Sequence, residues 1–140
     1  MRAAAVDFGS VRVGLAVADE IGLLAHPRPF LDGRDPQGVL RDLKALVLNE
    51  GIDVFVVGLP RRLDGKEGPS ARRAREFAGA LRKATGVRVV LKDEWLTTRE
   101  AKGRLREQGL DERAQRGRID SASAAVLLQS FLDAERGREP

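Results

Sequence analysis

Residues 2–18 alternate between two kinds of side chain, and this alternation constrains the fold more than any other feature. Residues 3–6 and 11–17 have the composition of short β-strands, and only Phe8, Gly9 and Ser10 separate them after Asp7. One parity of the two strands carries small residues and the other carries mostly branched ones. The pattern predicts an antiparallel hairpin with one shallow face and one packed face, and with Gly9 at a positive φ in the turn.

Asp7 is the acidic residue at the end of the first predicted strand. It has the parity of Ala3 and Ala5, so we expect its carboxylate on the shallow face, where a bulky ligand or an ion can approach it. Aspartate next to a phenylalanine and a glycine is also ordinary turn chemistry that needs no function. Local sequence favours this simpler interpretation, and the rest of the chain has to decide between the two.

The remaining sequence predicts an edge strand and then alternating helices and strands. Pro27 and Pro29 suit an edge strand within residues 23–32. Helices are expected over 36–50, from about 69 to 85, over 98–108 and over about 120–135, with strands at 53–58 and 87–91. Antiparallel strands followed by βα crossovers predict an α/β fold, a mixed five-stranded sheet flanked by helices. We expect residues 1–140 to form a single domain with a disordered tail over about 134–140.

Composition excludes several classes of site. The chain has no cysteine and a single histidine, His26, so disulfides and thiolate metal sites are excluded and zinc is disfavoured. His26 is interpreted as structural. We expect a cytoplasmic protein without membrane contact, because no signal pattern or long apolar run is found. A formal charge of +4 is compatible with nucleic acid, whereas the absence of tyrosine argues against an aromatic stacking platform.

Acidic residues mark three places where chemistry could occur. Besides Asp7, Asp93 and Glu94 follow the last predicted strand and Asp120 opens the final helix. Sites in open α/β sheets form at the carboxyl ends of strands. Asp93 and Glu94 could instead be ordinary loop acids, and Asp120 a simple N-cap. If the acids converge, their mutual repulsion requires a hard cation such as Mg²⁺ or Mn²⁺, and such a site can hydrolyse phosphodiesters.

Basic residues flank these acids in the predicted loops. They could neutralise backbone phosphates at the same end of the sheet. The candidates for nucleic-acid contact are Arg12, Arg61, Arg62, Lys66, Arg113, Arg116 and Arg118. Basic residues on the helix of residues 69–85 are interpreted as solvated surface charge, namely Arg72, Arg75, Arg82 and Lys83.

Four stretches together resemble one bacterial family, over residues 2–133. They are VDFGSVRVGLAVAD, VVGLPRRLDGKEGPSARRAREFAGAL, VVLKDEWLTTREAKGRL and RIDSASAAVLLQSFLD. In order and spacing they are similar to the YqgF family, also called RuvX. The resemblance implies an RNase H-like fold, two-metal nuclease chemistry with Mg²⁺ or Mn²⁺, and catalytic, metal-binding acids at Asp7, Glu94 and Asp120. The family's usual DERLTT is DEWLTT here, so Trp95 replaces an arginine and is expected to stack on the nucleic acid or to pack against the last strand.

The leading hypothesis is a divalent-metal-dependent nuclease acting on structured nucleic acid in 5′-end processing of pre-16S rRNA. An alternative is a Holliday junction resolvase, which makes paired cuts and therefore should be a homodimer. A further alternative is a non-catalytic nucleic-acid-binding factor in ribosome assembly, in which the acids are structural. A sugar-kinase-like phosphate binder shares the early hairpin, but the chain is too short for its two lobes.

Overall fold

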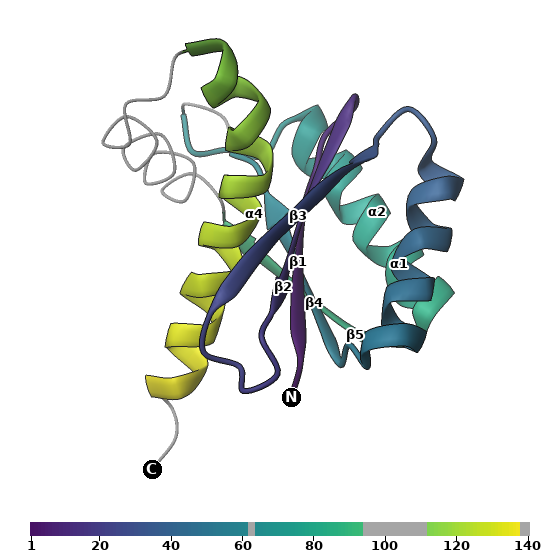
Figure 1. The fold of residues 1–140 in the computed structure, drawn as a ribbon. Helices are drawn as coiled ribbons and strands as arrows, with labels where there is room; N and C mark the ends of the chain where they lie inside the picture. Colours follow the sequence, from purple (N-terminus) through teal and green to yellow (C-terminus); the bar gives the residue numbers. More distant parts are fainter. Residues whose placement is uncertain (62–63, 94–111, 138–140) are drawn as a thin grey trace.

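The computed structural model describes residues 1–61, 64–93 and 112–137, and of residues 112–121 only the backbone course. In this part of the chain, five strands form one mixed sheet in the order β3-β2-β1-β4-β5. Helices α1 and α2 cover one face of the sheet and α4 covers the other (Figure 1). The elements are β1 (Ala3–Phe8), β2 (Arg12–Ala18), β3 (Ala25–Asp32), α1 (Pro36–Glu50), β4 (Val54–Leu59), α2 (Pro69–Thr85), β5 (Arg88–Asp93) and α4 (Glu112–Gly137).

The N-terminal hairpin forms as predicted, with two differences in its turn. β1 extends to Phe8, so the connection is Gly9, Ser10 and Val11. Gly9 has no positive φ, which corrects the prediction. Its lack of a side chain serves a close backbone approach instead, because a Cβ on Gly9 would lie 2.4 Å from the carbonyl oxygen of Arg12. The turn thus requires glycine for space and not for handedness.

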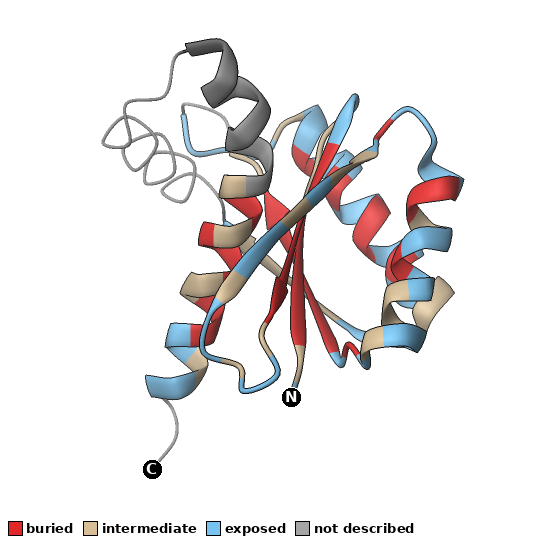
Figure 2. Cartoon of the chain, in the orientation of Figure 1, coloured by how far each residue is buried: buried red, intermediate tan, exposed pale blue. Residues whose placement is uncertain are grey.

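The two faces of the hairpin differ in side-chain size, and different helices pack on them. Most of β1 and β2 is buried (Figure 2). On the α1 and α2 face, Val6 and Val13 belong to a core of branched and aromatic residues. On the other face, Ala5 and Ala16 belong to a core with Leu127 and the rest of the apolar part of α4. Small side chains let a helix approach a sheet closely. The face predicted to be shallow is therefore shallow, and α4 packs along it.

Three parallel strands set the edge at which a site can form. β1 pairs with β4 and β4 with β5, all in parallel, so the carboxyl ends of the three strands lie at one edge of the sheet. β5 reaches Asp93, two residues beyond the predicted end, and Leu59 at the end of β4 pairs with Asp93. β3, which contains Pro27 and Pro29, is an edge strand of the sheet as predicted.

The boundaries of α1 and α2 follow from the local sequence. Asp35 accepts a hydrogen bond from the Gly38 amide at 3.1 Å through its side chain, which caps α1, and Gly51 ends the helix with φ of 67°. α2 starts with Pro69 and ends before Gly86, at φ of 70°. Both helices were predicted with these boundaries.

Helix α4 is longer than predicted at both ends. It begins at Glu112, so the basic stretch that was expected to precede it is helical, and it continues to Gly137, so residues 134–137 do not belong to a disordered tail. The reason is composition, because the added residues are mostly alanine, arginine, glutamate and glutamine, which favour helix. Position 120 consequently lies inside α4 and is not its N-cap.

No helix in the described ranges combines the length and the apolar character needed to cross a membrane. The helix predicted over 98–108 lies outside the described residues.

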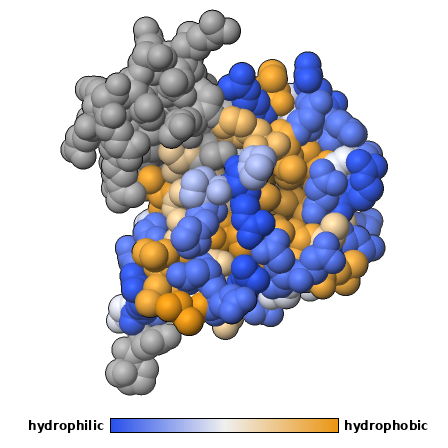
Figure 3. All heavy atoms as spheres, viewed as in Figure 1, coloured by the Kyte–Doolittle hydropathy of each residue, from blue (hydrophilic) through white to orange (hydrophobic). Residues whose placement is uncertain are grey.

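Exposed apolar residues gather at the end of the sheet opposite the hairpin turn. Ile21 and Leu24, in the connection between β2 and β3, are 76% and 57% exposed, and the main chain of Met1 lies beside Gly22. The space-filling view shows hydrophobic side chains at this lower end of the molecule (Figure 3).

Candidate active site

Asp7 lies at the carboxyl end of β1 and on the face covered by α4. Its neighbours in the strand, Val6 and Phe8, both point to the opposite face, and the Phe8 ring stacks on Phe77 of α2 with ring centroids 4.4 Å apart and planes 6° from parallel. This stacking fixes the end of the strand on the α2 side. Across the hairpin, Asp7 pairs with Gly14, which has no side chain to compete for space. The half-buried Asp7 therefore lies on the shallow face, as predicted.

Helix α4 runs along this face toward the Asp7 end. Near its C-terminal end, Gln129 accepts a hydrogen bond from the Ala25 amide at 2.9 Å and donates one to the Leu23 carbonyl oxygen at 2.8 Å. Leu23 and Ala25 lie at the end of the sheet opposite the hairpin turn. The N-terminal half of α4 therefore extends toward the carboxyl edge of β1 (Figure 1), and residue 120 lies in that half.

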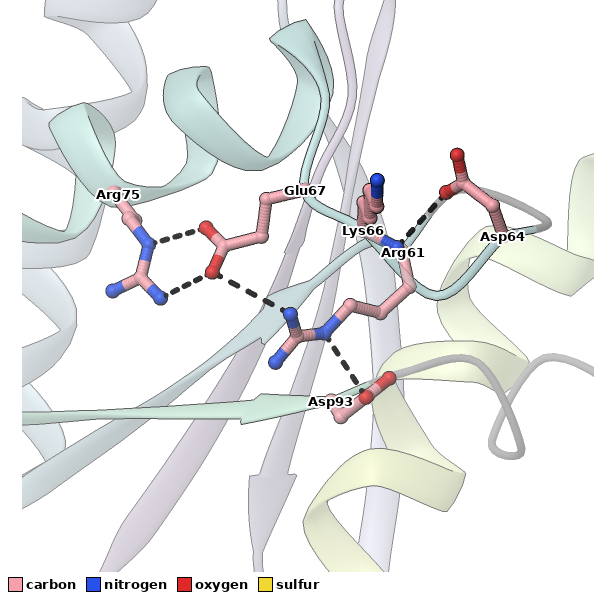
Figure 4. Close-up of polar contacts among 6 residues, drawn as sticks. All are labelled: Arg61, Asp64, Lys66, Glu67, Arg75 and Asp93. Carbon is pink, nitrogen blue, oxygen red and sulfur yellow. Dashed lines mark hydrogen bonds and ion pairs between the residues drawn. The ribbon is translucent and has the colours of Figure 1, made fainter.

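A chain of ion pairs joins the loop after β4 to the end of β5 (Figure 4). Arg61 donates from Nε to Oδ2 of Asp93 at 3.1 Å and from Nη1 to Oε2 of Glu67 at 3.5 Å. Arg75 of α2 binds the same Glu67 carboxylate with two shorter hydrogen bonds, at 2.6 and 2.8 Å. Hydrogen bonds from Arg75, supported by its charge and that of Arg61, hold the pKa of Glu67 below its ordinary value.

Asp93 lies on the other face of the sheet from Asp7. Its parity in β5 is that of Val89 and Leu91, which pack with the α1 and α2 core. Asp93 binds Arg61 there. The two aspartates at this edge thus point to different faces, and only Asp7 has the face of α4.

Three of the predicted phosphate contacts have described side chains. Arg12 is exposed at the start of β2, with its guanidinium carbon 5.6 Å from the centre of the Phe30 ring. Lys66 is exposed, and its amide donates to Oδ1 of Asp64 at 2.9 Å, which shapes the loop after β4. Arg61 is 30% exposed. All three are near the carboxyl edge of the sheet, either in the loop after β4 or beside the hairpin turn.

The other predicted site residues have no described side chain. Glu94, Trp95 and Arg62 lie outside the described residues. Four more belong to α4 by backbone alone, namely Arg113, Arg116, Arg118 and Asp120. Among the side chains that the structure describes, no three acidic, histidine or cysteine residues group as a metal site.

Sequence reasoning missed Glu67 and the role of Arg75. Arg75 was interpreted as solvated surface charge, yet it anchors Glu67. The available signal was spacing, because Glu67 precedes the N-cap Gly68 of α2 and Arg75 lies about two turns into the helix. That signal is weak, since a contact between a loop residue and a helix depends on how the loop enters the helix.

Similarity to known proteins covers almost the entire chain. The sequence model of the family described as "RuvX: Holliday junction resolvase" matches residues 1–134. The chain belongs to the RuvX family. A relative named "Putative pre-16S rRNA nuclease" from Anaeromyxobacter sp. (strain Fw109-5) is 47% identical over 133 residues, which are 95% of this chain and 97% of the relative. A relative of the same name from Streptomyces coelicolor is 44% identical, covering 99% of this chain and 85% of the relative.

Solved structures confirm the predicted RNase H-like fold. The chain is similar to T. thermophilus RuvC in complex with a Holliday junction substrate, with a TM-score of 0.62 at 15% identity, covering 99% of this chain and 97% of that one. It is also similar to the Fowlpox virus resolvase in complex with Holliday junction DNA, with a TM-score of 0.59 at 11% identity. This match covers 96% of this chain and 99% of the resolvase chain. At these identities the similarity concerns the fold.

Proposed function

We propose that the protein is a divalent-metal-dependent nuclease that hydrolyses phosphodiester bonds of structured nucleic acid in 5′-end processing of pre-16S rRNA. The observation that carries the proposal is the position of Asp7. It is half-buried at the carboxyl end of a central strand, on the shallow face along which α4 runs. Family membership and the names of relatives over nearly the full chain support the same activity.

Glu94 is the second proposed catalytic acid, and strand alternation supports it. Val90 packs with the α4 core, so Val90 and Lys92 have the parity of the α4 face and Asp93 has the opposite one. The position after Asp93 therefore has the parity of Asp7. Alternation in the described part of β5 thus supports Glu94 as a partner of Asp7 in the proposed site.

Asp120 is the third proposed acid, and its place in α4 supports it. Position 120 is one turn before Ala124, which packs against the sheet, and it lies in the half of α4 that extends toward the carboxyl edge. A helix residue one turn from a buried one shares its face.

These acids suit Mg²⁺ or Mn²⁺, because hard divalent cations prefer carboxylate oxygens. The surroundings of Asp7 are compatible with such an ion, since its cross-strand partner Gly14 and the alanines of the same face place no bulky side chain beside it. Asp7, Glu94 and Asp120 would hold the cation, which supplies charge neutralisation at the scissile phosphate and activation of water when bound. The three acidic residues would fix the place of cleavage. The bound cation would offset the repulsion between their carboxylates.

Basic residues around the carboxyl edge are proposed to bind backbone phosphates. Arg12, Arg61 and Lys66 are in position to do so from the hairpin and from the loop after β4. The same role is proposed for Arg62, Arg113, Arg116 and Arg118, and nucleic-acid contact for Trp95.

Holliday junction resolution is the second candidate function. The description of the family and the two solved resolvase structures favour it. Two symmetric cuts require two active sites, so a resolvase of this size should be a homodimer, whereas trimming an rRNA end requires one. A catalytically silent ribosome-assembly factor would bind nucleic acid without any metal-stimulated product.

The test is Asp7→Asn, with Asp42→Asn on the exposed face of α1 as the control for the same change of charge. We expect Asp7→Asn to reduce Mg²⁺- or Mn²⁺-stimulated cleavage by about a thousandfold or more while nucleic-acid affinity is retained, because loss of a catalytic group has effects of this size. Asp42→Asn should cleave like the wild type. Cleavage that survives Asp7→Asn would contradict the central assignment.

Two substrates tested side by side separate the candidates. Wild-type protein is given a precursor 16S rRNA fragment and a four-way DNA junction, each with Mg²⁺ or with Mn²⁺, and its mass is measured by sedimentation. Trimming of the rRNA alone supports the first function, and paired symmetric cuts in the junction by a dimer support the second. Binding to either substrate with no product supports the non-catalytic alternative.

A further inference from the structure

The ion-pair chain from Arg75 through Glu67 and Arg61 to Asp93 is unequal along its length. Arg75 holds Glu67 by two hydrogen bonds of 2.6 and 2.8 Å and comes from α2, a regular helix. Arg61 reaches Glu67 by one contact of 3.5 Å and Asp93 by one of 3.1 Å. Paired hydrogen bonds between a guanidinium and a carboxylate are stronger and more directional than single ones. Glu67 is thus firmly held on one side and directs Arg61 on the other.

Arg61 keeps donors for a further anion in this arrangement. A guanidinium has five N–H groups, and the contacts with Asp93 and Glu67 engage Nε and Nη1, while Nη2 carries two more. The side chain is 30% exposed at the carboxyl ends of β4 and β5. A phosphate arriving at this edge therefore meets a guanidinium that is already oriented and partly desolvated.

Orientation in advance has a physical advantage for a long side chain. A free arginine loses rotamer entropy when it is fixed in one geometry. A side chain that is fixed before the substrate binds does not lose this freedom during the reaction. The longer, single contacts of Arg61 can also be exchanged for phosphate contacts while Arg75 retains Glu67.

We propose that Glu67 is a positioning residue, which holds Arg61 across the carboxyl ends of β4 and β5 so that its guanidinium meets a backbone phosphate of the nucleic-acid substrate at this edge of the sheet, away from the cleaved bond. This inference rests on the proposed nuclease function. Glu67 itself does not touch the substrate, and it acts through Arg61. Its anchor is Arg75, which is a second positioning residue.

A positioning role predicts that cleavage and binding separate. Removing the Glu67 charge makes the loop more positive, so nucleic-acid affinity should not fall. The cleavage rate should fall about tenfold or more, because a small misplacement of the substrate is costly in rate even when the lost contact lies away from the reacting group. A carboxylate that serves only as surface charge predicts no such separation.

The experiment compares Glu67→Gln with Glu76→Gln, which makes the same change of charge on an exposed position of α2. Single-turnover cleavage is measured with Mn²⁺ at saturating enzyme, and affinity is measured without divalent metal over a series of salt concentrations. The substrate is whichever of the rRNA fragment and the four-way junction the wild type cleaves. We expect Glu67→Gln to lose about tenfold or more in rate with affinity within about twofold of wild type, and Glu76→Gln to match wild type.

Two further variants test whether the effect passes through Arg61. Glu67→Gln should cause no additional loss of rate in an Arg61→Lys background, because a lysine lacks the planar group that Glu67 orients. Arg75→Gln should reproduce part of the loss, with Arg72→Gln as its control, and it provides the same test if Glu67→Gln folds poorly.

The outcomes separate this inference from the proposed function. Equal rates for Glu67→Gln and Glu76→Gln, or an equal loss from Glu67→Gln with and without Arg61, would overturn the inference alone. Absence of metal-stimulated cleavage by the wild type would overturn the proposed function and the inference together.

Discussion

Gly33 shows how a single residue outside the site controls its geometry. It is buried where β3 leads into α1, and its amide donates to the carbonyl oxygen of Val11 at 2.9 Å. A Cβ on Gly33 would lie 2.3 Å from the carbonyl oxygen of Gly9 and 3.1 Å from the carbonyl carbon of Ser10. The contacts are with backbone, which cannot rotate away. Gly33 thus allows the backbone of the hairpin turn next to Asp7 to pack closely against the backbone between β3 and α1.

Gly33→Ala should therefore destabilise the protein by about 1–3 kcal/mol, the usual cost of forcing extra volume into a packed site. Gly79→Ala is the matched control, because Gly79 lies in α2 with open space around its Cβ position, and there alanine should stabilise by up to about 1 kcal/mol. Urea denaturation of both variants measures the difference. A Gly33→Ala protein as stable as wild type would show that the turn can shift without cost.

Elements far from the site are joined by Glu50 at the end of α1. Its carboxylate binds Arg28 of β3 with two hydrogen bonds of 2.7 and 3.1 Å and also binds Arg2, which precedes β1, at 3.3 Å. Arg2 in addition donates to the carbonyl oxygens of Ala18 and Glu50. One helix end and three strands are thus connected by a partly buried ionic group.

Glu50→Gln tests this connection through its pH dependence. Hydrogen bonds from Arg28, together with the charges of Arg28 and Arg2, hold the pKa of Glu50 below its ordinary value of 4.5. A carboxyl group with a lowered pKa stabilises the fold above its ordinary pKa, and the stabilisation is lost as pH falls through the folded value. We expect Glu50→Gln to cost about 1 kcal/mol at pH 7 and progressively less as the pH falls below 4.5 through the lowered pKa.

The measurement is the free energy of unfolding of both proteins in urea across this pH range. Glu76→Gln, on the exposed side of α2, should show a much smaller difference at every pH. A cost for Glu50→Gln that is the same at pH 3 and pH 7 would show that the ion pairs do not account for it.

At the scale of the whole molecule, the candidate site depends on segments that are far apart in the chain. Asp7 is near the N-terminus, β5 leads to residue 94 after the centre, and α4 packs back over β1 and β2 with residue 120 in its first half. The small residues of β1 and β2 are what allow α4 to lie along the face of Asp7. Placement of the proposed metal ligands is therefore coupled to the packing of α4 on the sheet.

This coupling predicts that the proposed metal stabilises the folded state. A cation that binds only the folded protein adds about 1.4 kcal/mol at ten times its Kd, so Mn²⁺ or Mg²⁺ should raise the Tm of the wild type by a few degrees. Asp7→Asn should abolish most of the shift and Asp42→Asn should retain it. Thermal unfolding with and without each metal measures the effect independently of activity, and an equal shift in Asp7→Asn would remove Asp7 from the metal site.

The features that could be predicted from sequence are local ones. The hairpin, the boundaries of α1 and α2 and the face of Asp7 follow from alternation, from capping at Asp35 and from glycines after helices, which act over a few residues. Gly9 was assigned the wrong reason because a conformational need and a spatial need both select glycine. The length of α4 was underestimated because charged residues suit both loops and exposed helix.

Contacts between distant segments had to come from the tertiary structure. The spacing from Glu67 distinguishes Arg75 only weakly from its neighbours on α2, because the path of the loop into the helix decides whether the two side chains meet. Asp93 and Asp7 look equivalent as acids at strand ends, yet their parity places them on opposite faces of the sheet. Alternation, capping and composition are properties of neighbouring residues, whereas an ion pair or a shared face depends on how strands align and how helices pack.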